Sequence, residues 1–252
     1  HLDHLGALSN IPGEATVHIP SIPLYDIMEE KWRMTPSWLN LIPRKYYVNL
    51  EEVIPFEVDR NGVEAIPTSH SAFPAYAYLY YGSDETVLYT GDFRIKSYLT
   101  TEEFQDMTGG PALLDYFDEK RDIKIDLLII EGTNIGSVRI PIDPEESISL
   151  HEKILKNSGN VLVTTHNLDL EYVALLSDMA EKYDKTLYTT SIQIAKLLEK
   201  SPKMNIKLHL LEEYTSDITF EELTPLISME PDSLIVTSYR EAINLLRDVK
   251  AS

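Results

Sequence analysis

Segments with the patterns of strands and helices alternate through the second half of the chain, and this alternation limits the folds open to it. The predicted strands are short and apolar, and they cover residues 160–165, 185–190, 206–211 and 233–237. The predicted helices cover residues 168–183, 192–200 and 240–249. Strands that are separated by helices usually run in the same direction within one sheet. The second half is therefore predicted to form a mostly parallel sheet with helices packed against it.

The first half of the chain has a different sequence pattern. Prolines are frequent in the first 60 residues, which favours turns and short elements over long helices. The continuous apolar run at 126–130 is typical of a strand that is covered on both faces. A boundary between two domains is expected within 136–146. Before that boundary, further strands are predicted at 63–67, 76–81 and 86–90.

Composition excludes several classes of protein. Of the 252 residues, 43% are hydrophobic and 25% are charged, as in ordinary globular proteins. The 22 basic and 41 acidic side chains give a net charge of −19, which argues against a surface built mainly to bind nucleic acid but leaves room for a small basic or metal-lined cleft. Cysteine is absent, so disulfides, thiolate metal sites and cysteine nucleophiles are excluded. Without a long apolar run or a signal-peptide pattern, the sequence predicts a cytoplasmic protein with no membrane contact.

Histidine and aspartate residues stand at the places where metal ligands are often found. His1, Asp3 and His4 lie within one short segment, His70 follows a predicted strand, and Asp92 follows the next but one. Imidazole nitrogens and carboxylate oxygens bind zinc and similar ions, and an aspartate can bridge two of them. Each motif alone is a weak signal, because a histidine near a chain end is often solvated and a Gly-Asp pair after a strand is often a turn.

Taken in order, four segments resemble the metallo-β-lactamase superfamily, and within it the β-CASP nucleases of the ribonuclease J type. That family has a loop written H-x-H-x-D-H-x-G, then a histidine after a strand, a strand ending in T-G-D-F-[KR], and a strand ending in an acidic residue. The matching segments here are HLDHLG at 1–6, TSHS at 68–71, TGDFR at 90–94 and LLIIEGTN at 127–134. The TGDFR segment and its place after His70 are the most specific parts.

The resemblance covers essentially the whole chain and implies an α/β fold in two parts. Residues 1–140 would form an incomplete metallo-β-lactamase core of the αββα type. Residues 141–252 would form a β-CASP α/β domain with a mostly parallel sheet. The first histidine of the family loop would lie two residues before His1, and the family's last metal-binding histidine would follow residue 252. The sequence is therefore expected to be an internal piece of a longer enzyme.

The resemblance also implies a centre of two zinc ions, with manganese or magnesium as alternatives. His1, His70 and Asp92 would bind one ion, and Asp3, His4 and Asp92 would bind the other, so that Asp92 is the bridge. Two such ions can hold a hydroxide and the phosphate oxygens of an in-line displacement. Asp3 could also orient or deprotonate the attacking water.

Protonation of the leaving group falls in this family to an acidic residue and a histidine of the β-CASP motifs. Glu131 is the candidate for the acid and His166 the candidate for the histidine. Both have simpler interpretations: Glu131 at a strand end could accept hydrogen bonds from backbone N–H groups of the next turn, and His166 before a helix could be a loop residue without chemistry.

Three hypotheses about function follow. The first is hydrolysis of RNA phosphodiester bonds, endonucleolytic or from the 5′ end, with single-stranded RNA as the partner and a homo-oligomer as the possible assembly. The second is a metallo-hydrolase of a small ester, lactone or thioester, which leaves residues after 150 unexplained. The third is a non-catalytic fragment or a partner in a nuclease assembly, which the acidic surface would suit.

Overall fold

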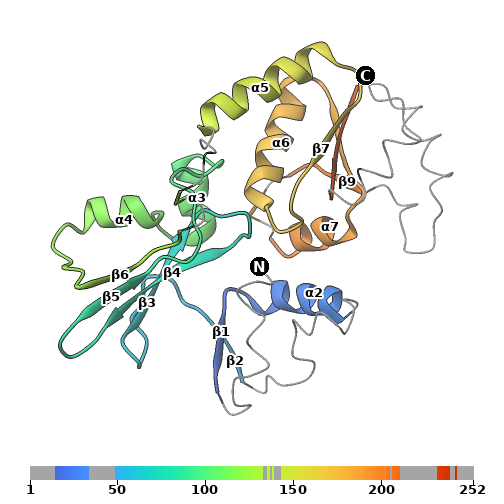
Figure 1. Ribbon diagram of the computed structural model, residues 1–252. Coiled ribbons are helices and arrows are strands. Elements are labelled where there is room, and N and C mark those ends of the chain that lie inside the picture. Colours follow the sequence, from blue (N-terminus) through green and yellow to red (C-terminus); the bar gives the residue numbers. More distant parts are fainter. Residues whose placement is uncertain are drawn as a thin grey trace.

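The structure is a computed structural model, and it describes residues 15–33, 49–132, 135–136, 138, 143–201, 203–204, 206–210, 232–238 and 242. Its described part is a mixed α/β protein with three sheets (Figure 1). The strands are β1 (Val17–Ile19), β2 (Leu50–Glu52), β3 (Val63–Thr68), β4 (Ala75–Tyr81), β5 (Thr86–Tyr89), β6 (Leu127–Ile129), β7 (Val161–Thr164), β8 (Thr186–Thr189), β9 (His209–Leu210) and β10 (Ser233–Thr237). The helices are α2 (Ile22–Arg33), α3 (Thr101–Thr108), α4 (Leu113–Glu119), α5 (Pro144–Asn157), α6 (Leu170–Lys182) and α7 (Ile192–Glu199).

A mixed sheet has the strand order β3-β4-β5-β6. β4 is antiparallel to both of its neighbours, whereas β6 is parallel to β5. At the start of β3, Gly62 has φ +79°, and a Cβ there would lie 2.7 Å from the Tyr81 carbonyl oxygen, so the close approach of the two strands requires glycine. Helix α4 covers the sheet, with Leu113 and Tyr116 packed in one cluster with buried strand residues: Ile66, Ala77, Leu79 and Leu88.

A buried carboxylate ties α4 to this sheet. Glu64 of β3 is 3% exposed and accepts hydrogen bonds from the hydroxyl groups of Tyr81, at 2.8 Å, and Tyr116, at 2.6 Å. Burial together with these bonds raises the pKa of Tyr81 to about 12 and also raises the pKa of Tyr116. Both phenols are therefore protonated donors at neutral pH.

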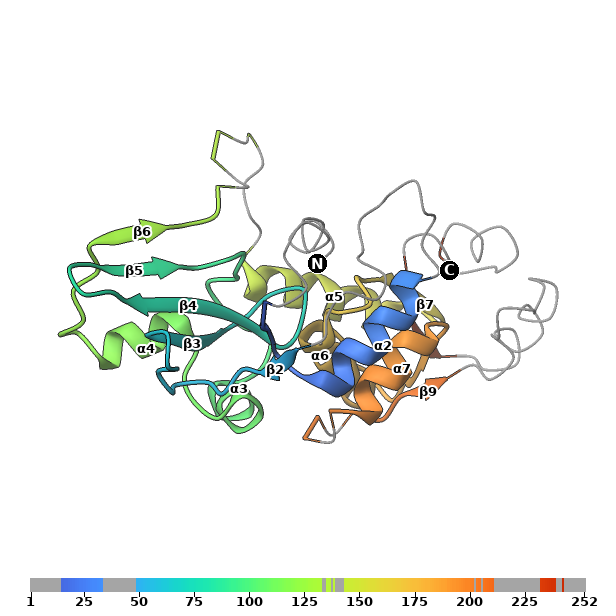
Figure 2. The ribbon, with the colours of Figure 1, turned by 90° about the horizontal axis from the view of Figure 1, so that it is seen from below.

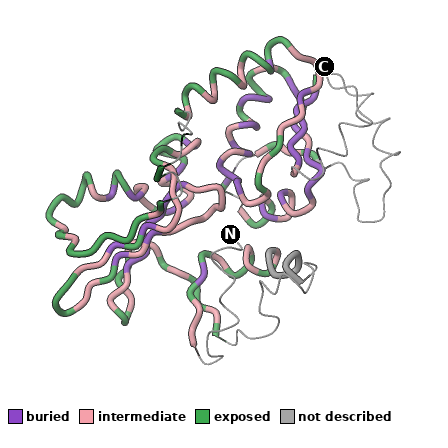
Figure 3. The backbone as a smooth tube through the Cα atoms, in the orientation of Figure 1, coloured by how far each residue is buried: buried purple, intermediate pink, exposed green. Residues whose placement is uncertain are grey.

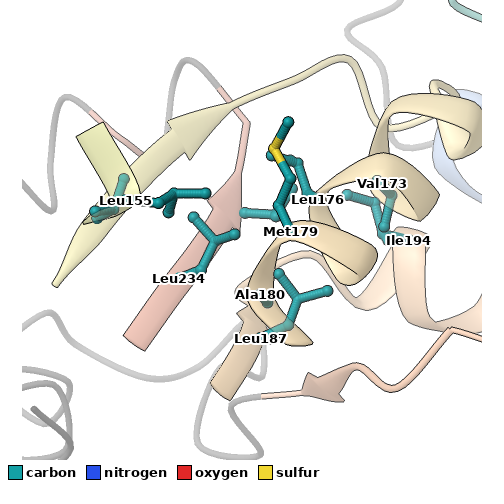
Figure 4. Packing of buried hydrophobic residues seen from close by; sticks show 10 residues of the cluster. Leu155, Val173, Leu176, Met179, Ala180, Leu187, Ile194 and Leu234 are labelled. Atoms are coloured by element: carbon teal, nitrogen blue, oxygen red, sulfur yellow. The ribbon is translucent and has the colours of Figure 1, made fainter. Parts of the chain in front are cut away.

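The second four-stranded sheet has the order β7-β10-β8-β9 and is parallel throughout. This confirms the prediction for the second half, although β9 is shorter than the predicted strand at 206–211. Side chains of α5, α6 and α7 pack against the strands, and Figure 4 shows residues of this core converging from helices and strands. The buried residues labelled there are Leu155, Val173, Leu176, Met179, Ala180, Leu187, Ile194 and Leu234.

Helix α3 lies between the two four-stranded sheets (Figure 1). It begins with a capping box: Thr100 Oγ1 accepts from the Glu103 N–H, and the Glu103 carboxylate accepts from the Thr100 N–H. Its Phe104 packs with Leu99 and with Ala174 of α6. The helices α3, α4 and α5 are not among those predicted from the sequence. The predicted helix at 240–249 lies outside the described residues, apart from Ala242.

The proline-rich first segment contains more regular structure than expected. Its described part has the parallel strand pair β1–β2 and the 12-residue helix α2. Pro23 is the second residue of α2, where a missing N–H costs little, so this proline marks the start of a helix and does not prevent it. Leu24 and Ile27 pack against Leu170 and Leu197, and Figure 2 shows α2 beside α7.

The strand β6 differs from its prediction. It is the outer strand of the mixed sheet, and its apolar side chains are about half exposed in the described structure (Figure 3). The exposed fractions are 47% for Leu127, 50% for Leu128, 45% for Ile129 and 53% for Ile130. The expectation of a strand covered on both faces is therefore wrong for this chain as described. None of the helices within the described ranges has the length and apolar character that a bilayer-spanning segment needs.

Candidate functional site

The mixed sheet brings three of the predicted site residues to one edge, namely the end of the sheet at which the strands β3, β5 and β6 finish. β3 and β5 both run toward this edge, because each is antiparallel to β4 between them, and β6 runs parallel to β5. His70 comes just after β3, Asp92 just after β5, and Glu131 just after β6. The order of the motifs in the sequence thus becomes a set of neighbouring strand ends.

His70 and Asp92 form the centre of this edge. The His70 Nε2 and Asp92 Oδ2 atoms are 3.9 Å apart, and both side chains reach solvent, with exposed fractions of 19% and 27%. Burial lowers the pKa of the His70 imidazole, and the positive Arg94 acts in the same direction, while the negative Asp92 opposes both. The imidazole is therefore neutral at neutral pH, which is the form that binds metal ions.

Glu131 accepts a hydrogen bond from the backbone N–H of Phe93 through its Oε1 atom, at 3.1 Å. Its carboxylate therefore contacts the residue that follows Asp92. This differs from the simpler interpretation in the sequence analysis, in which Glu131 binds the turn after its own strand. The contact holds the loop after β5 to the end of β6 and fixes the backbone next to Asp92.

The donors of the pair suit a zinc ion. Two ligands of one tetrahedral zinc ion stand about 3.3 Å apart when each metal–ligand bond is about 2.0–2.1 Å long. The His70–Asp92 distance of 3.9 Å is only slightly longer than this. Among the residues that the structure describes, no group of three or more His, Asp or Glu side chains could hold a metal ion. The other predicted ligands, His1, Asp3 and His4, lie outside the described residues.

His166 belongs to the other sheet. It follows β7, its side chain is exposed, and its Nδ1 atom accepts from the Leu168 N–H at 3.3 Å. Its carbonyl oxygen accepts from the N–H of Asp169, the N-cap residue of α6. His166 thus lies in the loop that leads into α6, which is the helix in contact with the His70 loop.

The carboxylates at the start of α6 are not among the site residues predicted from the sequence. Glu171 is completely buried, and its Oε2 accepts from the hydroxyl groups of Ser69 and Ser97, both at 2.6 Å. Its Oε1 accepts from the His70 backbone N–H at 3.3 Å. Burial raises the pKa of Glu171, and the serine hydrogen bonds oppose this shift. The signal for it in the sequence is a glutamate in an apolar stretch at the start of the helix, between Leu170 and Tyr172.

Arg94 joins the two sheets through a salt bridge. Its guanidinium group makes two hydrogen bonds to the Asp169 carboxylate, one of them at 2.9 Å, and lies over the Tyr98 ring at 4.8 Å from the centroid. Its backbone N–H donates to the Ser69 carbonyl oxygen at 2.7 Å. Arg94 therefore neutralises a nearly buried aspartate.

No protein-family model matches the chain, and no curated protein matches it. Among solved structures, the crystal structure of a protein of unknown function from Enterococcus faecalis V583 is similar, with a TM-score of 0.58 at 17% sequence identity. The match covers 92% of this chain and 55% of the other, so this chain spans about half the length of that protein. At this identity the similarity concerns the fold alone.

Proposed function

We propose that this chain is part of a metal-dependent hydrolase of the metallo-β-lactamase superfamily, of the β-CASP type, that cleaves RNA phosphodiester bonds. The observation that carries the proposal is the 3.9 Å approach of His70 and Asp92, which come from two different strand ends. The mixed sheet before residue 140 and the parallel sheet after it support the proposed order of a lactamase-like part and a β-CASP part.

In this proposal His1, His70 and Asp92 would hold one zinc ion, and Asp3, His4 and Asp92 would hold a second. A bound zinc ion supplies Lewis-acid polarisation of the phosphate and a water molecule of lowered pKa. His70 presents a neutral nitrogen, and Asp92 adds negative charge beside it. Glu131 orients Asp92 through the Phe93 N–H. His166, exposed at the end of β7, is the proposed donor of a proton to the leaving oxygen.

The test is cleavage of a 5′-labelled single-stranded RNA with and without added Zn²⁺. We expect zinc-dependent cleavage, and a loss of more than about 100-fold in Asp92→Ala, because the site would lose the ligand that is proposed to serve both ions. Asp84→Ala is the matched control, since Asp84 is an aspartate in the turn that joins β4 and β5, at the opposite end of the sheet. This control is expected to keep the wild-type rate.

Three results would contradict the proposal. Turnover of a small ester or lactone with no cleavage of RNA would assign the site to the second class of metallo-hydrolase. A folded wild-type chain that takes up no zinc and cleaves neither substrate would indicate a non-catalytic partner of a nuclease assembly. Equal RNA cleavage by the wild type and by Asp92→Ala would remove Asp92 from the site.

A further inference from the structure

Glu171 connects the parallel sheet to the end of the mixed sheet that carries His70 and Asp92. It belongs to the first turn of α6, yet the three donors to its carboxylate belong to the loops after β3 and β5: Ser69, His70 and Ser97. One of them is the backbone of a proposed metal ligand, and Ser69 precedes that ligand directly. Ser97 is in the loop that carries Asp92. A single buried carboxylate thus contacts both loops that carry the His70–Asp92 pair.

Other hydrogen bonds make the two loops one unit around this carboxylate. The Arg94 N–H donates to the Ser69 carbonyl oxygen at 2.7 Å, which joins the loop after β5 to the loop after β3. The Ser97 hydroxyl, which donates to Glu171, also accepts from the Leu99 N–H at 3.0 Å. Movement of Glu171 would therefore be transmitted through hydrogen bonds to the two loops that carry the proposed ligands.

We propose that Glu171 is a positioning residue that sets the distance between His70 and Asp92 and thereby the affinity of the site for its metal ion. This inference rests on the proposed function, because it assumes that the pair binds zinc. Residues that orient metal ligands through hydrogen bonds are known to influence metal affinity strongly. Burying a carboxylate is costly without compensating donors, and the donors that compensate here lie beside the ligands.

The informative variant is Glu171→Gln, which keeps the shape of the side chain. A glutamine has one acceptor oxygen, whereas the glutamate uses both oxygens. If the amide oxygen faces the serines, the NH₂ group faces the His70 N–H, and two donors meet. If the NH₂ group faces the serines, Ser97 must change its hydrogen bonds while it still accepts from Leu99. The first orientation sets two donors against each other, and the second requires both serine hydroxyls to turn from donors into acceptors, so either one changes the hydrogen bonds that hold the two loops.

The experiment measures zinc affinity by competition with a chelator, using Zn²⁺ alone as the probe. We expect the dissociation constant of Glu171→Gln to rise about tenfold over the wild type. The matched control is Glu64→Gln, which also removes the charge of a buried glutamate with two hydroxyl donors, but far from the ligand loops. Glu64→Gln is expected to lose stability and to keep the zinc affinity of the wild type.

A second readout does not involve metal. In the zinc-free protein, hydrogen exchange of the His70 backbone amide is expected to be faster in Glu171→Gln and unchanged in Glu64→Gln. Weaker zinc binding together with faster exchange supports the inference. Wild-type zinc affinity in a folded Glu171→Gln overturns it and leaves the proposed function standing. A wild type that takes up no zinc overturns the proposed function, and the inference with it.

If Glu171→Gln fails to fold, the variant Ser97→Ala tests the inference in its place. It removes one donor to the carboxylate and leaves the other two, so the same changes in zinc affinity and in His70 exchange are expected at a smaller size. Wild-type values of both quantities in Ser97→Ala would overturn the inference.

Discussion

Glu64 and Glu171 show how this protein accommodates buried carboxylates. The first lies inside the mixed sheet and the second at the start of α6, and each accepts hydrogen bonds from two hydroxyl groups. A carboxylate without donors loses its hydration and gains nothing in return, so the hydroxyl partners are required for its burial. The two residues differ in what their partners do. The donors to Glu64 join a helix to a sheet, whereas the donors to Glu171 belong to the candidate site.

Because the tyrosines that bind Glu64 have raised pKa values, the folded protein is expected to lose stability at alkaline pH. The pKa of Tyr81 is raised to about 12 in the folded protein, whereas an unfolded tyrosine titrates near pH 10. Above about pH 10 the folded state binds more protons than the unfolded state, so the free energy of unfolding falls as the pH rises toward about 12. Below about pH 10 this contribution is fully present.

The measurement is the urea midpoint of unfolding at about pH 9 and about pH 11. Tyr81→Phe is expected to reduce the decline between the two values, because one of the titrating groups is gone. Tyr80→Phe is the matched control, since Tyr80 is the neighbouring tyrosine of β4 and is 42% exposed. An equal decline in the wild type and in Tyr81→Phe would show that other groups govern the alkaline transition.

At the same scale, the sequence predicted part of the candidate site. His70 and Asp92 could be paired because each follows a strand, and the ends of alternate strands of an antiparallel sheet lie at one edge. Glu171 could not be paired with Ser69, which is 102 residues away in the chain. Local patterns describe the helix that carries a residue and say nothing of the loop that the helix meets.

Among the elements, strands were predicted more closely than short helices. The bounds of β3, β4, β5 and β10 agree with the predicted ranges to within one residue. Alternating or continuous apolar residues mark such strands locally. Helix α3 has few apolar residues, and its buried side chains are Phe104 and Thr108, so its clearest signal is the Thr100–Glu103 capping box.

The exposure of β6 leads us to expect that two leucines of the same sheet contribute differently to stability. Leu79 is 0% exposed, and Leu128 is 50% exposed. Leu79→Ala leaves a cavity in the core and is expected to cost about 2–5 kcal/mol of unfolding free energy. Leu128→Ala removes a side chain that is already half in water, so a cost below about 1 kcal/mol is expected.

Urea unfolding of both variants, under the same conditions, checks this contrast. The structure requires a clearly smaller loss for Leu128→Ala. Similar losses in the two variants would mean that β6 is covered in solution, as its apolar composition alone predicts. The sequence pattern of a strand indicates which surface it would bury, but the elements that pack on its faces decide whether that surface is buried.

At the scale of the whole molecule, the alternation of strands and helices predicted the parallel sheet, whereas the contact between the two four-stranded sheets was not predictable. That contact depends on pairs from distant parts of the chain, such as Arg94–Asp169 and Phe73–Leu168. It also includes the apolar packing of α3 on α6. A salt bridge needs two particular residues in one geometry, and a sequence contains many other arginines and aspartates that could pair.

Loss of the Arg94–Asp169 salt bridge is expected to destabilise the folded protein. The Asp169 side chain is 7% exposed, and it caps α6 by accepting from the Tyr172 N–H at 3.3 Å. Arg94→Met keeps much of the apolar length of the side chain but leaves this nearly buried carboxylate without its cation. We expect a loss of about 2–3 kcal/mol in the free energy of unfolding. Arg94→Lys should recover only part of it, because an ammonium group does not reproduce the two parallel bonds of a guanidinium.

Urea unfolding followed by circular dichroism measures these losses, with Arg121→Met as the matched control. The Arg121 side chain donates to the carbonyl oxygen of Asp118 on the surface, so a change within about 0.5 kcal/mol is expected there. If Arg94→Met cost no more than Arg121→Met, the salt bridge would contribute little to holding the sheets together. The apolar contact of Phe104 with Ala174 would then have to provide that stability, and variants at Phe104 would show the loss that Arg94 did not.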